Sequence, residues 1–309
     1  MRGNLQKVLG KLLPRGASSG AIEPTDTFEI QPLVFEQDID SWLASEPNRQ
    51  GADKGELVVA TLNTWFGEYF FERRLEATLE LLRDSEADII GLQEMTRESL
   101  EILSAESWVR DGYSISDADG STFEDYGVVI LSRVPIHRLE IHQLPGPMGR
   151  RVVVAELLLN GESLHVVAVH LESLRSSAPV RVAQLHDLFE LLASSRHSVI
   201  MGDFNFCASW PENDHLDSAY TDVWSRVRPQ EPGYTEDTDI NRMRAFVTRK
   251  SKQVRFDRIL LRSQNPGWVA REIELLGVDP VAPGLPLVYP SDHFGLVSRL
   301  AWQKAGATV

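Results

Sequence analysis

The sequence predicts an α/β fold with mixed β-sheets, and two observations carry this prediction. From Leu57 onward, short apolar runs rich in β-branched residues, typical of buried strands, at first alternate with a helical pattern. In the middle of the chain strand patterns follow one another directly, and Asn160-Gly161 is a preferred two-residue hairpin turn. Alternating units and hairpins together predict sheets with both parallel and antiparallel strands.

The individual elements follow from the same patterns. Strands are predicted at 57–62, 87–92, 126–131, 151–159, 164–169, 198–201, 254–261 and 294–300, and helices at 71–82 and 180–193. Residues 1–54 differ in composition: Gly16 to Gly20 is typical of a flexible linker, 48–55 of a loop, and 28–43 is expected to pack on the main domain. We therefore predict a partly flexible N-terminal extension at 1–54 and one domain at 55–303.

Composition narrows the class of protein. The 309 residues carry a net charge of -14, which repels polyphosphates at long range, so a nucleic-acid substrate would need a local basic patch or a metal ion. The single cysteine, Cys207, excludes an intrachain disulfide and favours a cytoplasmic protein. No apolar run is long enough for a membrane span, which predicts no integral membrane association. Residues 1–20 have helical spacing interrupted by lysines, which favours a surface helix or a tail over a signal peptide.

Polar side chains stand at or near the ends of six predicted strands. These residues are Asn63, Glu94, His170, Asp203, Asn205, Asp257 and His293. Each alone has an ordinary explanation: a solvated strand end, a turn former, a buried histidine or a surface ion pair. Neighbouring strands of an α/β fold deliver their ends to one place, so the whole set predicts a shared site.

The motifs around these residues resemble those of a known superfamily. They are Thr61-Leu-Asn63, Leu92-Gln-Glu94, Tyr126-Gly-Val-Val-Ile-Leu-Ser132, His170-Leu-Glu-Ser173, Gly202-Asp-Phe-Asn205, Arg255-Phe-Asp-Arg-Ile259 and Ser291-Asp-His-Phe-Gly295. In this order they resemble the endonuclease/exonuclease/phosphatase superfamily, and within it most closely the tyrosyl-DNA phosphodiesterase branch. The resemblance implies a four-layer α/β sandwich, two mixed β-sheets flanked by helices, in which 55–303 is the catalytic domain. It also implies metal-dependent hydrolysis of phosphate esters, on nucleic-acid ends or tyrosyl-DNA-like adducts.

The resemblance also implies a metal site. Mg²⁺ prefers oxygen ligands and keeps several waters, so one carboxylate with substrate oxygens suffices to bind it. Glu94 resembles the superfamily's metal-binding glutamate, Asn63 is an oxygen donor beside it, and Asp292 is expected near the metal, directly or through water. We therefore expect a Mg²⁺ cofactor, for which Mn²⁺ is an expected substitute.

The remaining polar residues are candidates for catalysis. A general base needs a pKa near neutral and a fixed tautomer, which His293 meets if Asp257 orients it. Asp203 is expected to orient or deprotonate the attacking water, so the choice of base between His293 and Asp203 stays open. Asn205 and His170 are expected to donate hydrogen bonds to the water or the phosphate.

The substrate is less clearly specified than the chemistry. Ser173, Arg175 and Tyr234 are candidate substrate-binding residues. The superfamily branch has an aromatic residue in place of Glu236, and Leu-Arg in place of Phe206-Cys207. With the acidic net charge, these departures favour an alternative substrate, a small-molecule or lipid-headgroup phosphate. A non-catalytic binding module is disfavoured, because every catalytic and metal-binding position is filled. The oligomeric state stays open.

Overall fold

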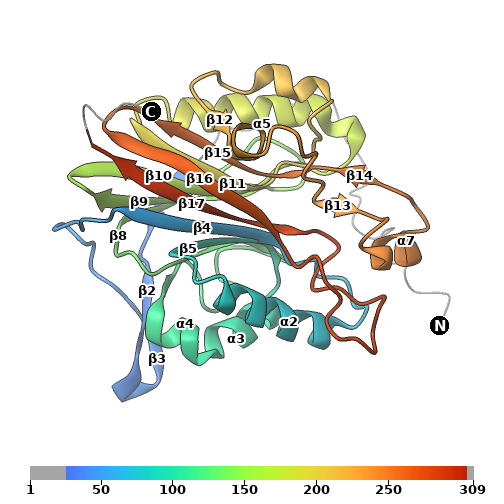
Figure 1. Cartoon of the computed structure of the whole chain (residues 1–309). Coiled ribbons are helices and arrows are strands. Elements are labelled where there is room, and N and C mark those ends of the chain that lie inside the picture. The colour runs from blue at the N-terminus through green and yellow to red at the C-terminus, as the bar shows by residue number, and fades with distance from the viewer. Residues whose placement is uncertain (1–25, 305–309) are drawn as a thin grey trace.

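The computed structural model describes residues 26–304 as two large mixed β-sheets packed face to face, with helices on their outer faces (Figure 1). In the seven-stranded sheet, β10 and β11 are parallel while β9, β8 and β15 run antiparallel to their neighbours. In the eight-stranded sheet, β4 and β5 are parallel and β17 and β7 flank them in antiparallel orientation. The predicted four-layer sandwich is therefore confirmed.

The bounds of the elements are as follows. The seven-stranded sheet has the order β1 (Thr27–Ile30), β8 (Ile136–Gln143), β9 (Arg151–Leu159), β10 (Glu162–His170), β11 (His197–Asp203), β15 (Asp257–Ser263) and β12 (Thr221–Asp222). The eight-stranded sheet has the order β16 (Gly267–Leu276), β17 (Gly295–Gln303), β4 (Glu56–Asn63), β5 (Ile89–Met95), β7 (Gly127–Ser132), β6 (Ser114–Ile115), β2 (Leu33–Glu36) and β3 (Ser41–Ala44). A separate hairpin pairs β13 (Glu236–Asp237) with β14 (Gln253–Val254). The α-helices are α2 (Phe71–Asp84), α3 (Arg97–Ala105), α4 (Ser107–Gly112), α5 (Ala178–Leu191), α6 (Val223–Val227) and α7 (Arg242–Thr248), and the short 3-10 helices are η1 (Gln37–Ile39), η2 (Arg175–Ser177) and η3 (Pro211–His215).

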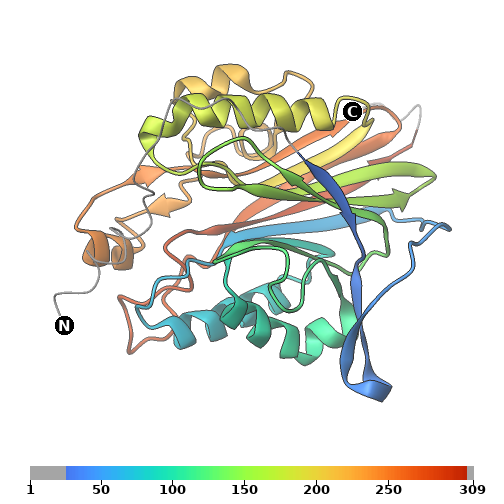
Figure 2. The same ribbon diagram turned by 180° about the vertical axis from the view of Figure 1, so that it is seen from behind.

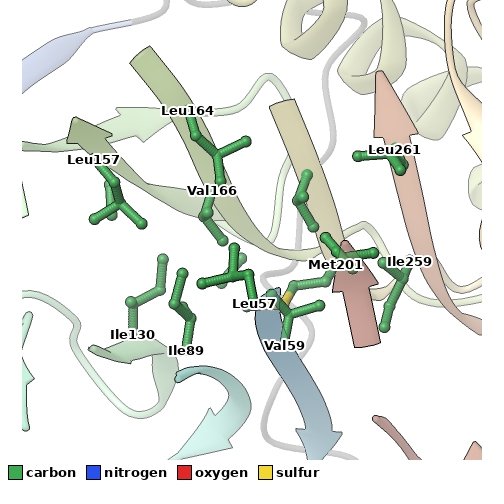
Figure 3. Close-up of a cluster of buried hydrophobic side chains, with 14 of the residues drawn as sticks. Leu57, Val59, Ile89, Ile130, Leu157, Leu164, Val166, Met201, Ile259 and Leu261 are labelled. Atoms are coloured by element: carbon green, nitrogen blue, oxygen red, sulfur yellow. The ribbon is translucent and has the colours of Figure 1, made fainter. Parts of the chain in front are cut away.

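Apolar side chains fill all three interlayer spaces. Between the two sheets, Leu57 and Val59 of β4 meet Met201 of β11 and Ile259 of β15 (Figure 3). The alternate residues of β4, Val58, Ala60 and Leu62, point to the other face and belong to the cluster that includes α2 and α3 residues. A third cluster joins α5 to the outer face of the seven-stranded sheet. Strands covered on both faces read as continuous apolar runs, which is why the central strands were predictable.

The segment after residue 25 contributes strands to both sheets. β1 pairs with β8 at the edge of the seven-stranded sheet, and β2 pairs with β6 in the other (Figure 2). The expected packing of 28–43 on the main domain is thus realised as sheet extension, while the domain boundary at 54 stays a prediction. The predicted linker and N-terminal helix lie outside the described residues.

One predicted strand is divided in the structure. The sequence predicts one continuous strand at 254–261, but residues 253–254 pair with β13, and β15 begins only at Asp257. Arg255 leaves the run to pair with Asp222, and the backbone N–H groups of Phe256 and Asp257 donate to the Thr235 hydroxyl. The break places Asp257 at the start of its strand. No helix within residues 26–304 has the length and apolarity needed to cross a membrane.

Gly202 allows the close approach of β10 and β11 at the site. Its φ is +139°, and a Cβ atom there would lie 2.0 Å from the carbonyl oxygen of Val169. We expect Gly202→Ala to destabilise the fold by on the order of 1–3 kcal/mol, because the backbone must move to relieve the contact. Urea denaturation would measure this, with Gly284→Ala as the control, since no atom lies within 4 Å of a Cβ at Gly284. Equal stability of both variants would contradict the expectation.

Candidate active site

Six strand ends from both sheets meet at one end of the sandwich. Asn63 ends β4, and its side-chain nitrogen donates to Glu94 at 3.2 Å and to Asp203 at 3.1 Å. Glu94 lies near the end of β5 in the same sheet, whereas Asp203 ends β11 of the opposite sheet. Asn63 therefore joins the two sheets at the site, and its buried amide holds both carboxylates. Its own oxygen accepts the backbone N–H of Trp65, so its role as a metal ligand stays a prediction.

Glu94 is aimed by an irregularity in its strand. The pairing of β5 with β7 shifts register between Leu92 and Met95, and Glu94 takes a left-handed backbone conformation with φ +59°. A non-glycine residue pays a strain energy for this conformation, which is often found at functional sites. The result is a carboxylate that accepts from Asn63 through Oε1 and from the backbone of Phe66 through Oε2.

His293 and Asp257 form a hydrogen-bonded pair at the centre of the site. The Nδ1 of His293 lies 2.8 Å from Oδ2 of Asp257, and both side chains are buried. Since a carboxylate only accepts, Nδ1 carries a proton and Nε2 is the atom left for chemistry. Thr235, absent from the predicted site, fixes this pair: its hydroxyl accepts from the backbone of Asp257, and its carbonyl accepts from Phe294.

His170 and Asp203 end the parallel neighbours β10 and β11 and are register partners. The Nδ1 of His170 faces an Nη1 of Arg150 at 3.2 Å, so Nδ1 accepts and the proton sits on Nε2, 3.5 Å from Asp203. Burial, with the positive charges of Arg150 and His293, holds the pKa of His170 well below its usual value. A neutral His170 therefore presents an N–H toward the centre of the site.

The other predicted site residues differ in their exposure and in their contacts. Asn205 donates its backbone N–H to Asp203 and its amide to the carbonyl of Leu171. Ser173 accepts a 2.8 Å hydrogen bond from Arg150. Arg175 is exposed and stacks 5.0 Å from the Trp210 ring centroid. Tyr234 is half-buried beside Thr235 in sequence, and its part in substrate binding stays a prediction.

Four charged residues of the site have no counterpart in the predicted set. Arg150 is buried between His170 and Tyr126, and lies in the loop before β9. Glu236, Arg244 and Lys252 come from the β13–α7–β14 segment, where Arg244 pairs with Asp292 at 2.9 Å. None of these four residues stands at the end of a predicted strand, so the sequence pattern does not mark them. Only Glu236 is distinguished in the sequence, because the superfamily branch has an aromatic residue in its place.

The clustered charges shift the pKa values of the central groups. Burial raises the pKa of Asp203 to about 6, Asp257 adds to the rise, and His293 opposes it. Burial and the charge of Asp292 raise the pKa of Glu94 to about 7. Burial by itself would lower the pKa of His293, but Asp257, Asp203 and Glu236 outweigh it and hold that pKa well above its usual value.

The carboxylates fit a divalent cation. Asp292 is close enough to Glu94 for its charge to raise the pKa of Glu94, and both offer oxygen, the donor that Mg²⁺ prefers. A cation between them would relieve this repulsion. Asp203, Asp257 and His293 also lie close enough together to hold an ion. In that second group, however, the bond between His293 and Asp257 already uses one ligand atom of each.

Comparison with known proteins places this site in a family context. Residues 60–293 match the Endonuclease/Exonuclease/phosphatase family. Tyrosyl-DNA phosphodiesterase 2 (TDP2) of Gallus gallus is 29% identical over 220 residues, 69% of this chain and 58% of that protein. The Homo sapiens protein of the same name is 30% identical over 183 residues, 55% of this chain and 48% of that protein. The chain thus spans about half the length of these relatives.

Solved structures share the fold. The structure of D. rerio TDP2 with a single-strand DNA product superposes with a TM-score of 0.68 at 23% identity, covering 80% of this chain and 99% of that one. An endonuclease/exonuclease/phosphatase from Bacteroides vulgatus superposes with a TM-score of 0.63 at 17% identity, covering 81% and 100%. At these identities the likeness extends to the fold alone.

Proposed function

The chain belongs to the endonuclease/exonuclease/phosphatase family, and from this premise we propose that it is a Mg²⁺-dependent phosphodiesterase acting on nucleic-acid ends. The observation that carries the proposal is the convergence of Asn63, Glu94, Asp203 and the His293–Asp257 pair from both sheets onto one site. Diester hydrolysis needs an activated water, charge neutralisation and donors for the developing negative charge. Each of these has a candidate residue.

We assign the proton-accepting role to Asp203. Its pKa of about 6 lets it be ionised at neutral pH and still take a proton from water. Its Oδ1 is held by the backbone of Asn205, and its Oδ2 by Asn63 with His170 nearby, so the carboxylate is fixed in orientation. Fixed geometry is what makes a base effective.

His293 then acts as a cation rather than as the base. Its raised pKa, set by three surrounding carboxylates, keeps the ring doubly protonated at neutral pH. Asp257 holds Nδ1, which leaves the Nε2–H as a donor to a phosphate oxygen. Arg150 and His170, which are hydrogen-bonded to each other, would supply further donors.

Glu94 and Asp292 would hold the metal, with Asn63 beside them. A bound divalent cation supplies charge neutralisation at the phosphate oxygens. Mg²⁺ is proposed over softer metals because the ligands are carboxylates, and Mn²⁺ is expected to substitute for it.

The surroundings favour a nucleic-acid substrate despite the net charge of -14. Residues 242–252, in and after α7, hold five cations and no carboxylate, which provides the local basic patch that the acidic protein needs. Phe246 in this segment is 60% exposed, and Phe66 packs on Tyr126 with ring centroids 4.8 Å apart near the site. Exposed aromatic rings are platforms for unpaired bases.

The relatives named TDP2 support a tyrosyl-DNA-like adduct as one such substrate. We also propose a cytoplasmic location, because the chain contains one cysteine.

The first test is metal-dependent turnover. Purified protein with Mg²⁺ is expected to hydrolyse bis-p-nitrophenyl phosphate and, with higher kcat/KM, a 5′-tyrosyl oligonucleotide. EDTA should abolish both activities and Mn²⁺ restore them. His293→Ala is expected to lower kcat by about 10²- to 10³-fold on both, because one charged donor to the developing oxyanion is lost.

His197→Ala is the matched control, since His197 is equally buried but begins β11 at the far end from Asp203. Turnover of neither diester by folded, metal-binding protein would refute the proposed activity. In that case the alternative, a small-molecule or lipid-headgroup phosphate, would be tested with phosphate monoesters and phospholipids.

A further inference from the structure

A network of four charged side chains lies on one side of His293. Glu236 Oε1 is 3.5 Å from Nε2 of His293 and 2.6 Å from the ammonium of Lys252. Glu236 Oε2 is 3.3 Å from Nε of Arg244, whose Nη1 reaches Asp292 at 2.9 Å. The network therefore links the β13–α7–β14 segment directly to the site.

The members of this network differ in exposure. The side chain of Glu236 is 2% exposed, whereas those of Lys252 and Arg244 are 31% and 27% exposed. An approaching substrate therefore meets two cations, and the carboxylate behind them is their buried counter-ion. Burial favours a paired carboxylate over a free one, so Glu236 keeps both cations pointed at this place.

The position of Lys252 is fixed by more than one contact. Its ammonium lies 4.2 Å from the ring centroid of Phe256, and its backbone N–H and carbonyl bond to Thr238 across the hairpin. A lysine held in this way loses little further entropy when it binds an anion.

We propose that Lys252 and Arg244 bind a second phosphate of the substrate, next to the phosphate that is hydrolysed, and that Glu236 positions them. The inference rests on the proposed function and adds a substrate requirement to it. Lys252 and His293 share one oxygen of Glu236, so groups bound to each would be neighbours. The two cations face two buried carboxylates, Glu236 and Asp292, and a metal ion at Asp292, as proposed above, would engage one of them. The partly exposed cations would then be available to a further anion, and a guanidinium with an ammonium suits phosphate oxygens.

The same network disfavours an apolar group in this place. A ring packed against Lys252 and Arg244 would remove water from both cations without replacing its hydrogen bonds, which carries a desolvation cost. The occupant that fits is therefore anionic. Both the next internucleotide phosphate and the ring phosphate of an inositol headgroup have this chemistry.

The test compares two substrates that differ only in the charge of the second phosphate. One is a thymidine dinucleotide with its 5′-phosphate esterified to p-nitrophenol, and the other carries a neutral methylphosphonate as the internucleotide linkage. For the wild-type protein, the neutral linkage is expected to lower kcat/KM by at least about tenfold, the effect of one good charged contact. In Lys252→Gln the two substrates should converge, because the charged substrate loses most of its advantage.

Two further variants make the result specific. Lys252→Arg should restore most of the preference for the charged linkage, since a cation is again present. Arg271→Gln removes the same charge from an exposed position on the edge strand β16 and should keep the full preference. A preference lost equally in both charge-removing variants would overturn the proposal, because it would then reflect net charge alone.

Binding measured without turnover separates affinity from catalysis. In EDTA, fluorescence anisotropy of the labelled dinucleotides should show tighter binding of the charged form, with a salt dependence whose slope falls by about 0.7 in Lys252→Gln. A parallel pair, glycerophosphoinositol and its 4-phosphate, tests the other source of a second phosphate. A Lys252-dependent gain with either pair supports the second-phosphate site.

The possible failures are distinguishable. If the protein hydrolyses the dinucleotides but neither pair shows a Lys252-dependent gain, the second-phosphate site is wrong and the phosphodiesterase activity stands. If the charged and neutral dinucleotides bind with equal affinity in EDTA, the site is also wrong. If no diester is hydrolysed although binding depends on Lys252, the second-phosphate site stands and the proposed activity fails.

Discussion

Asp203→Asn is expected to lower kcat by about 10²- to 10⁴-fold with Mg²⁺ present, because the amide cannot accept the proton of the attacking water. The asparagine keeps the size of the side chain, so the hydrogen bond from Asn205 can persist. The pH profile is the sharper measurement. Only the ionised form of Asp203 is a base, so wild-type kcat/KM should fall about tenfold per pH unit below about pH 6, and this limb should be absent from the residual activity of the variant.

Asp214→Asn, an exposed position in η3, is the control for a lost negative charge and should leave both rate and profile unchanged. Thermal denaturation of both variants would show that the fold persists. If Asp203→Asn keeps its rate within tenfold while His293→Ala loses activity together with the acidic limb, then His293 is the base and our assignment is reversed.

Glu94→Gln is expected to abolish Mg²⁺-dependent turnover and at the same time to stabilise the metal-free protein at pH 8. Loss of the metal removes several kcal/mol of transition-state stabilisation, at least about 10²-fold in kcat. The gain in stability arises because Glu94 is ionised at pH 8 in a place that disfavours its charge, beside Asp292. Glutamine is uncharged, so the repulsion by Asp292 is removed.

The sign of the pH dependence follows from proton linkage. The pKa of Glu94 is about 7 in the fold, against a usual value of 4.5, so the folded state holds an extra proton between these two pH values. The free energy of unfolding contributed by this group therefore falls as the pH rises through that range. We expect the variant to exceed the wild type by about 3 kcal/mol at pH 8 and to match it near pH 4.

Urea denaturation in EDTA at pH 4, 6 and 8 measures this difference. Added Mg²⁺ should stabilise the wild type by binding to its folded state and leave the stability of Glu94→Gln unchanged. The difference in free energy of unfolding between variant and wild type should therefore shrink or change sign. Glu76→Gln on the exposed face of α2 is the control. A variant that is less stable than the wild type at pH 8 in EDTA would contradict the expected electrostatic cost.

Much of the fold could be predicted from the sequence because the central strands are buried on both faces. The apolar runs at 57–62, 87–92 and 164–169 correspond to β4, β5 and β10 within one to three residues. The edge elements were harder to predict. β8 mixes buried with half-buried residues, and the sequence pattern predicts no strand there. β16 is buried at only three of its ten positions, and no strand is predicted there either. Short apolar stretches with mixed exposure give a weak periodic signal.

The polar strand ends were equally visible, for a related reason. Asn63, Glu94, His170 and Asp203 each follow a buried strand, so their types and order stand out against apolar neighbours. The sequence by itself thus determined the family, the sandwich fold and the set of residues from which a catalytic site is proposed.

Only the tertiary structure decided how those residues are charged and what surrounds them. The protonation of His293 depends on Asp257, Asp203 and Glu236, which come from three different elements. Lys252 and Arg244 reach the site because the β13–α7–β14 hairpin folds over His293, although nothing in their local sequence marks them as site residues. Electrostatic interactions depend on distance and burial, and both are set by contacts between residues far apart in the chain.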